Sequence, residues 1–135
     1  MRFVIIITVT MINLLGYSLC NKVDQSPADE IKIPGESVKI QCKHSVANYN
    51  QINWYRQNLQ NKELTFMGYL LAQSGKNTEK DFTDKIELSG DGNSEGFLTI
   101  KNLLSNDSAV YFCAAYYTVS QITVVHYKNI LFIFL

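Results

Sequence analysis

Two cysteines that are far apart in the sequence, with the chain's only tryptophan between them, limit the folds open to this protein more than any other feature. Cys42 and Cys113 stand 71 positions apart, and Trp54 follows the first of them by twelve. A disulfide that closed so long a loop would stabilise a fold by about 4 kcal/mol. That is comparable to the whole net stability of a small domain.

The first 20 residues have the composition of a secretory signal peptide. Arg2 precedes an apolar run, and small residues stand three and one positions before Asn21. The alternative is a membrane anchor, but polar residues interrupt the run, which is short for a hydrocarbon layer of about 30 Å. We therefore expect a signal peptide at 1–20 and entry into the secretory pathway. Cleavage removes Cys20, and the two cysteines that remain in an exported chain are expected to pair.

Composition argues against several function classes. Twelve basic residues balance twelve acidic ones, so no charge excess points to nucleic acid or an anionic surface. No Cys-x-x-Cys motif or cysteine beside a histidine suggests zinc, and His44 and His126 are expected to be solvated. No Ser/His/Asp set or phosphate-binding loop is evident. We expect a chain that is not an enzyme and has no metal or cofactor.

Alternation of apolar and polar residues predicts an all-β chain. In residues 36–43, Val38, Ile40 and Cys42 alternate with polar residues, the pattern of a half-buried strand. Further strands are predicted, each shorter or less regular, at 52–57, 64–70, 85–88, 98–101 and 109–114. Pro-Gly, Ser-Gly and Gly-Asp-Gly turn signals separate several of them. Many short antiparallel strands indicate a sandwich or a barrel.

The spacing of particular residues chooses between these. A cross-sheet disulfide packed on one buried tryptophan, with Tyr111 two residues before Cys113, is typical of the immunoglobulin sandwich. Trp54-Tyr55-Arg56-Gln57, 82–86 and 107–113 also fall in order, so the chain resembles an immunoglobulin V-set domain, here placed at 21–115. Within that family, the segments 54–57, 67–69 and 84–92 are most similar to a T-cell receptor beta variable segment. Receptor alpha chains, immunoglobulin light chains and innate V-set receptors share much of this pattern.

The resemblance implies structural and pairing roles. It implies a Greek-key sandwich with one cross-sheet disulfide, Trp54 and Tyr111 in the core, and a Lys85–Asp107 pair at its base. Alternation places Trp54 inward, so Tyr55, Gln57 and Phe112 should face outward. In the family this sheet packs against a second variable domain, here an alpha-like chain. We expect one solvent-facing patch made by Tyr55, Gln57, Leu64 and Phe112.

Ligand contacts in such a domain come from loops at one end of the sandwich. By position these loops lie at 44–51, at about 71–77 and from 114 onward. Their predicted contact residues are His44, Asn48, Tyr49, Asn50, Gln73, Ser74, Lys76, Ala115 and Tyr116. The first loop combines adaptable polar groups with one rigid ring, a mixture found in paratopes. Asn106-Asp107-Ser108 is a glycosylation sequon, but the predicted pairing of Asp107 argues against its use.

Residues 116–135 form an atypical tail. A complete variable domain continues into a last strand that carries Phe-Gly-x-Gly, and this chain has no glycine beyond Gly96. The last strand is therefore expected to be missing or atypical. Residues 117–119 can be encoded by TAC-ACA-GTG, which contains the recombination heptamer CACAGTG. The codons for residues 127–130 can contain a sequence close to the matching nonamer. We expect read-through of an unrearranged gene segment; the alternative is an unusual natural C-terminus.

The sequence thus predicts the variable domain of an antigen receptor, similar to T-cell receptor beta. It would pair with a second variable domain and recognise a peptide presented by MHC, on the extracellular face of the plasma membrane and with a signalling complex. No transmembrane segment is expected in this chain. The alternative is an innate V-set receptor or a secreted immunoglobulin-like binding module that needs no rearrangement.

Overall fold

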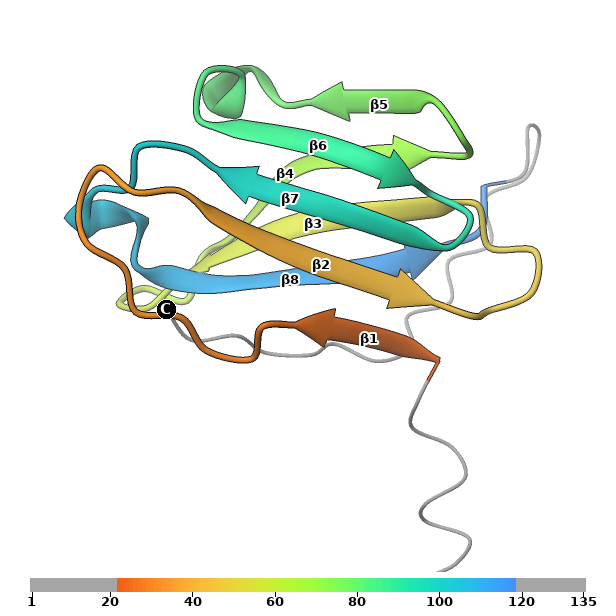
Figure 1. Cartoon of the computed structure of the whole chain (residues 1–135), viewed down its shortest axis with the longest axis horizontal. Helices are drawn as coiled ribbons and strands as arrows, with labels where there is room; N and C mark the ends of the chain where they lie inside the picture. The colour runs from red at the N-terminus through yellow and green to blue at the C-terminus, as the bar shows by residue number, and fades with distance from the viewer. Residues whose placement is uncertain (1–21, 119–135) are drawn as a thin grey trace, which may run out of the picture.

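The computed structural model describes residues 22–118, which fold into two facing β-sheets (Figure 1). The predicted signal peptide, His126 and residues 119–135 of the predicted tail lie outside the described residues. In chain order the strands are β1 (Val23–Ser26), β2 (Val38–His44), β3 (Gln51–Asn58), β4 (Leu64–Leu71), β5 (Gly75–Thr78), β6 (Ile86–Asp91), β7 (Glu95–Ile100) and β8 (Ala109–Tyr116). Two short 3-10 turns, η1 (Lys80–Phe82) and η2 (Ser105–Asp107), lie between strands.

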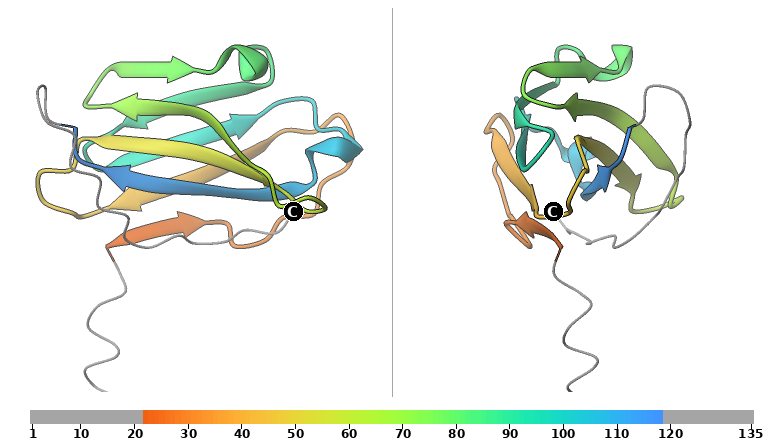
Figure 2. Two further views of the ribbon diagram at one scale, coloured as in Figure 1. Left: turned by 180° about the vertical axis from the view of Figure 1, so that it is seen from behind. Right: turned by 90° about the vertical axis from the view of Figure 1, so that its right-hand side faces the viewer.

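The strands pair in the orders β1-β2-β7-β6 and β5-β4-β3-β8, and neighbouring strands are antiparallel. The end-on view in Figure 2 shows the two sheets as separate layers. Strands distant in the sequence are neighbours, with β2 beside β7 and β3 beside β8, as Greek-key connections require. The predicted all-β sandwich is confirmed.

The residues from 22 to 118 contain no α-helix. No helix in that part of the chain is therefore long and apolar enough to span a bilayer.

The core lies between the sheets and is centred on the disulfide. The predicted bridge from Cys42 to Cys113 is confirmed and joins β2 of one sheet to β8 of the other. Trp54, on β3, is fully buried in the same cluster. Strand β2 alternates as predicted, with Val38, Ile40 and Cys42 inside and polar residues on the outer face. The remaining members of the core cluster are Ile52, Met67, Leu70, Ile86, Leu88, Leu98, Ile100, Leu103, Ala109 and Tyr111.

Candidate functional site

The base of the sandwich is held by the ion pair that the sequence predicts. Lys85 Nζ lies 2.5 Å from Asp107 Oδ2, and the same carboxylate oxygen accepts a hydrogen bond from the Leu104 amide at 2.7 Å. The Tyr111 hydroxyl donates to the Asp107 carbonyl at 2.7 Å, which completes a tyrosine corner. These contacts fix the turn η2, which leads the chain into β8.

Burial of Tyr111 makes the stability of the domain sensitive to alkali. Desolvation, aided by the Asp107 carboxylate and opposed by Arg56, raises the pKa of Tyr111 to about 12, against about 10 for an unfolded tyrosine. A raised pKa means that the stabilising contribution is complete below about pH 10 and is lost as the pH rises toward 12. We expect the free energy of unfolding to fall by roughly 2 kcal/mol more in the parent protein than in Tyr111→Phe across that interval. Urea titrations at several pH values measure this difference.

Tyr49→Phe is the matched control for that titration, since Tyr49 is a partly exposed loop residue. It should follow the parent protein through the alkaline range. At neutral pH, Tyr111→Phe should be less stable by about 1 kcal/mol because it loses one hydrogen bond. Parallel pH curves for the parent and Tyr111→Phe would contradict the prediction.

The outer face of the sheet β5-β4-β3-β8 carries a group of aromatic rings. Tyr55 and Phe112 are register partners on β3 and β8, and their rings stack with centroids 5.6 Å apart and planes 20° apart. Phe66 on β4 packs on the other side of the pair, 5.3 Å from the Tyr55 ring. We call the surface made by Tyr55, Gln57, Leu64, Phe66 and Phe112 the aromatic face.

The predicted exposure of this surface is wrong for one residue. Phe112 lies outside the core cluster, as its parity requires, but its side chain is only 5% exposed, and the Tyr55 ring stacks on it. Leu64 is 53% exposed, whereas Tyr55 and Gln57 are half-buried. The Gln57 side chain also donates to the Lys62 carbonyl at 3.1 Å within the β3–β4 hairpin. The face is therefore assigned correctly, but its exposed part consists of Leu64 and the edges of its neighbours.

A polar row that sequence reasoning missed runs beside these rings along β3. Gln51 Nε2 donates to Asn53 Oδ1 at 2.6 Å, and Asn53 Nδ2 donates to the Tyr55 hydroxyl at 3.3 Å. Asn53 is buried although it is polar, and these bonds satisfy it. The only available signal was its outward parity next to Trp54.

The predicted ligand loops gather at one end of the sandwich, at the right of Figure 1. Asn48, Gln73 and Ser74 are exposed there, while Tyr49, Asn50 and Tyr116 are half-buried. Lys76 lies on β5 and not in a loop, and its ammonium donates to the Leu88 carbonyl at 3.3 Å. The turn after β6, at 92–94, also lies at this end, although it was not among the predicted ligand loops.

Two of the predicted loop residues are buried, and the prediction is wrong for both. His44 is the last residue of β2, 4% exposed, and its Nε2 donates to the Gly92 carbonyl at 2.9 Å. The strand runs one residue further than predicted, and parity with Cys42 turns the imidazole inward. Ala115 is 7% exposed because β8 extends to Tyr116 and pairs this alanine with Ile52. Neither residue is solvated as a loop residue would be.

Comparison with known proteins agrees with this geometry. The family model of the immunoglobulin V-set domain matches residues 25–129. The chain belongs to the immunoglobulin V-set family. It is 31% identical over 93 residues to human T cell receptor beta variable 7-2, and the match covers 69% of this chain and 79% of that protein.

A solved structure supports the same fold. This V-set domain superposes with a TM-score of 0.67 on a chain from a study described as "Structural basis of T cell specificity and activation by the bacterial superantigen toxic shock syndrome toxin-1". The identity is 26%, and the match covers 82% of this chain and 90% of that one.

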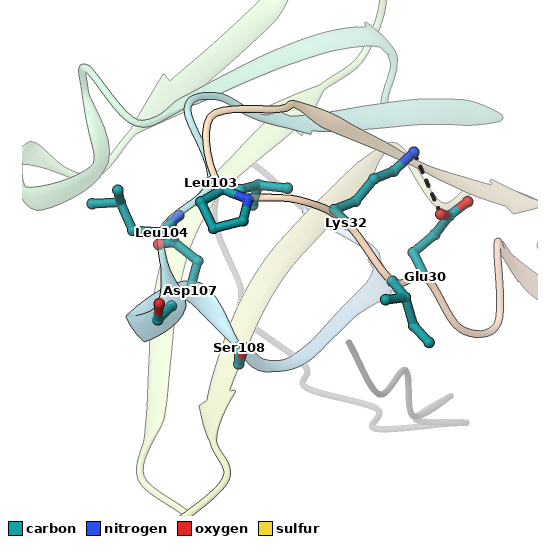
Figure 3. A pocket seen from close by; sticks show the side chains of 9 residues that line it. Glu30, Lys32, Leu103, Leu104, Asp107 and Ser108 are labelled. Carbon is teal, nitrogen blue, oxygen red and sulfur yellow. Dashed lines mark hydrogen bonds and ion pairs between the residues drawn. The ribbon is translucent and has the colours of Figure 1, made fainter.

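The base of the V-set domain also contains a hollow of about 300 Å³, seen from close by in Figure 3. It lies between the β1–β2 and β7–β8 connections, at the end opposite the predicted ligand loops. Its rim carries the Lys32–Glu30 ion pair at 3.5 Å, and Ile31 beside it is 97% exposed. Asp107 and Leu104 in its wall belong to the structural network of the base.

The sequon lies next to this hollow. Asn106 is exposed on η2, and its carbonyl accepts a hydrogen bond from Arg56 Nη2. The middle residue, Asp107, is held by Lys85 and the Leu104 amide as described above. Across residues 22–118, no group of three or more His, Cys, Asp or Glu side chains is placed to hold a metal ion.

Proposed function

We propose that this V-set domain is the variable domain of a T-cell receptor beta-like chain. It would pair with an alpha-like variable domain and recognise a peptide presented by MHC. The aromatic face is the observation that carries the proposal. Interfaces are enriched in aromatic residues at their centres. Leu64, 53% exposed on the same face as the packed rings of Tyr55, Phe66 and Phe112, is an apolar side chain well suited to burial by a partner.

The loop end supports the recognition half of the proposal. Asn48, Gln73 and Ser74 offer adaptable polar groups in solvent, and Tyr49 adds a rigid ring beside them. These loops continue from the ends of strands in both sheets, so a rigid scaffold positions them. The paired domain would contribute a second set of loops.

We further propose that the chain enters the secretory pathway and acts at the extracellular face of the plasma membrane, as part of a receptor with its signalling complex. Its role would be binding and not catalysis. Both cysteines of the described part are joined in a buried disulfide and are not nucleophiles.

Leu64→Asp is expected to weaken pairing by about tenfold or more, because a buried charge would replace an apolar contact in the interface. The measurement is binding to a panel of alpha-like variable domains by surface plasmon resonance. Since Leu64 is largely exposed in the isolated domain, the melting temperature should change little, so the loss can be assigned to pairing.

Ser89→Asp is the matched control, since Ser89 is exposed on β6 in the other sheet. It should leave the affinity unchanged. Equal binding by Leu64→Asp and the parent protein would place the partner elsewhere. Ligand binding by the unpaired chain would favour an innate or secreted V-set receptor instead.

A further inference from the structure

Hydrogen bonds link four separate segments at the loop end of the domain. The Asn50 amide donates to the Tyr116 carbonyl at 3.1 Å, and the Asn50 carbonyl accepts from the Ala72 amide at 2.7 Å. The Ala72 carbonyl in turn accepts from the Gly92 amide at 2.8 Å, and the Gly92 carbonyl accepts from His44 at 2.9 Å. Asn50 is the member of this series that joins the first loop both to the turn after β4 and to the end of β8.

The side chain of Asn50 adds a second connection, directed at the residues that follow β8. Its Oδ1 accepts from the Thr118 amide at 2.9 Å, and its Nδ2 donates to the Thr118 carbonyl at 3.3 Å. The carboxamide therefore satisfies both backbone groups of one residue. The Thr118 hydroxyl makes a separate bond, to Gln51 Oε1 at 2.5 Å.

We infer that Asn50 is a positioning residue for the third recognition loop, whose first residues follow β8. The inference rests on the proposed function only in treating these residues as part of a recognition loop. Because the carboxamide contacts backbone atoms alone, it holds residue 118 whatever side chain that position carries. It sets where the loop leaves the sandwich, while the side chains beyond remain free to vary with the ligand.

The carboxamide of an asparagine carries both the acceptor and the donor that this role uses at position 50. An aspartate keeps the acceptor for the amide but has no donor for the carbonyl, and a serine is too short to reach both groups. The Tyr117 ring stacks on the Tyr49 ring, with centroids 6.5 Å apart and planes 28° apart. The neighbours of Asn50 and Thr118 are therefore also in contact. The first loop thus supplies both a polar and an aromatic support for the start of the third.

Close packing around Asn50 shows that the segments bonded to it are held in a fixed geometry. A Cβ at Gly92 would lie 2.7 Å from the Asn50 carbonyl oxygen, 2.7 Å from the Leu70 carbonyl oxygen and 2.9 Å from the Ala72 nitrogen. Real side chains do not approach backbone atoms so closely. Position 92 therefore needs a glycine for the three segments to meet at Asn50.

Amide hydrogen exchange of the secreted chain, followed by NMR, tests the inference without any ligand or partner. In Asn50→Ala the amide of residue 118 should exchange about fivefold to tenfold faster, because one hydrogen bond is lost. In Asn50→Asp its protection should persist, since the acceptor remains. In Thr118→Ala the protection should also persist, because the Asn50 side chain bonds only to the backbone of residue 118.

Ser45→Ala is the control from the same loop and should leave the exchange at 118 unchanged; Ser45 is exposed. The amide of Ile52 in β3 reports whether each variant stays folded, and Asn50→Ser serves if Asn50→Ala does not fold. Unchanged amide exchange at residue 118 in both Asn50→Ala and Asn50→Ser would overturn the inference. Loss of protection in Thr118→Ala would do the same by making the Gln51 contact the anchor. Failure to pair with an alpha-like domain would count against the proposed function alone.

Discussion

Reduction of the disulfide between Cys42 and Cys113 is expected to lower the free energy of unfolding by about 4 kcal/mol. The bridge links residues that are 71 positions apart and joins the two sheets, so it removes many conformations from the unfolded chain. Small domains have only about 5–15 kcal/mol of net stability. The reduced protein should therefore be largely unfolded in mild urea in which the oxidised protein is native.

Urea unfolding, followed by the fluorescence of Trp54 with and without reductant, measures this loss. Trp54 is the only tryptophan and is fully buried in the same cluster as the disulfide, so it reports on the core. The double variant Cys42→Ala and Cys113→Ala is the control. It should be as unstable as the reduced parent protein and should not respond to reductant. A parent protein that keeps its urea midpoint on reduction would show that the cross-sheet bridge contributes little.

The centre of this fold could be predicted because two signals agree there: the alternation of apolar and polar residues, and the spacing of the cysteines, tryptophan and tyrosine. Val38, Ile40 and Cys42 alternate with polar residues, and β2 buries those three. Spacing and the family resemblance together placed Trp54 and Tyr111 in the core, and both are buried. The pair formed by Lys85 and Asp107 came from the family resemblance and not from periodicity.

The two shortest end strands of the sheets were harder to predict for a physical reason. Strands β1 and β5 are only four residues long and carry no run or alternation of apolar residues, unlike β6 and β8 at the opposite ends of the same sheets. Their backbone pairing depends on the neighbouring strand. Nothing in their own residues distinguishes them from loops.

The solvent exposure of a side chain was harder to predict than the face of the sheet to which it points. Parity placed Phe112 on the correct face, but its side chain is 5% exposed there and stacks with the Tyr55 ring. His44 and Ala115 were predicted to lie in loops because both strands were ended too early. His44 has the same parity as Cys42, so the signal for an inward imidazole was present in the alternation of β2.

Gln25 is the buried residue for which the sequence offered no signal, and its loss should be costly. It lies on β1 and is 8% exposed. Its Nε2 donates to the Tyr111 carbonyl at 3.0 Å, and its Oε1 accepts from the Cys113 amide at 3.0 Å. One side chain therefore links β1 of the first sheet to β8 of the second and satisfies two backbone groups there.

Gln25→Met should reduce the free energy of unfolding by about 2–6 kcal/mol, because it leaves a buried carbonyl and a buried amide without partners at about 1–3 kcal/mol each. Gln41→Met is the matched control, since the Gln41 side chain bonds to Ser26 and Glu95 on the partly exposed outer face. Water can replace those bonds, so its cost should stay below about 1 kcal/mol. Urea denaturation ranks the two variants, and hydrogen exchange at the Cys113 amide should accelerate only in Gln25→Met. Equal costs for the two variants would mean that Gln25 does not hold the sheets together, and that the disulfide and the apolar core do so without it.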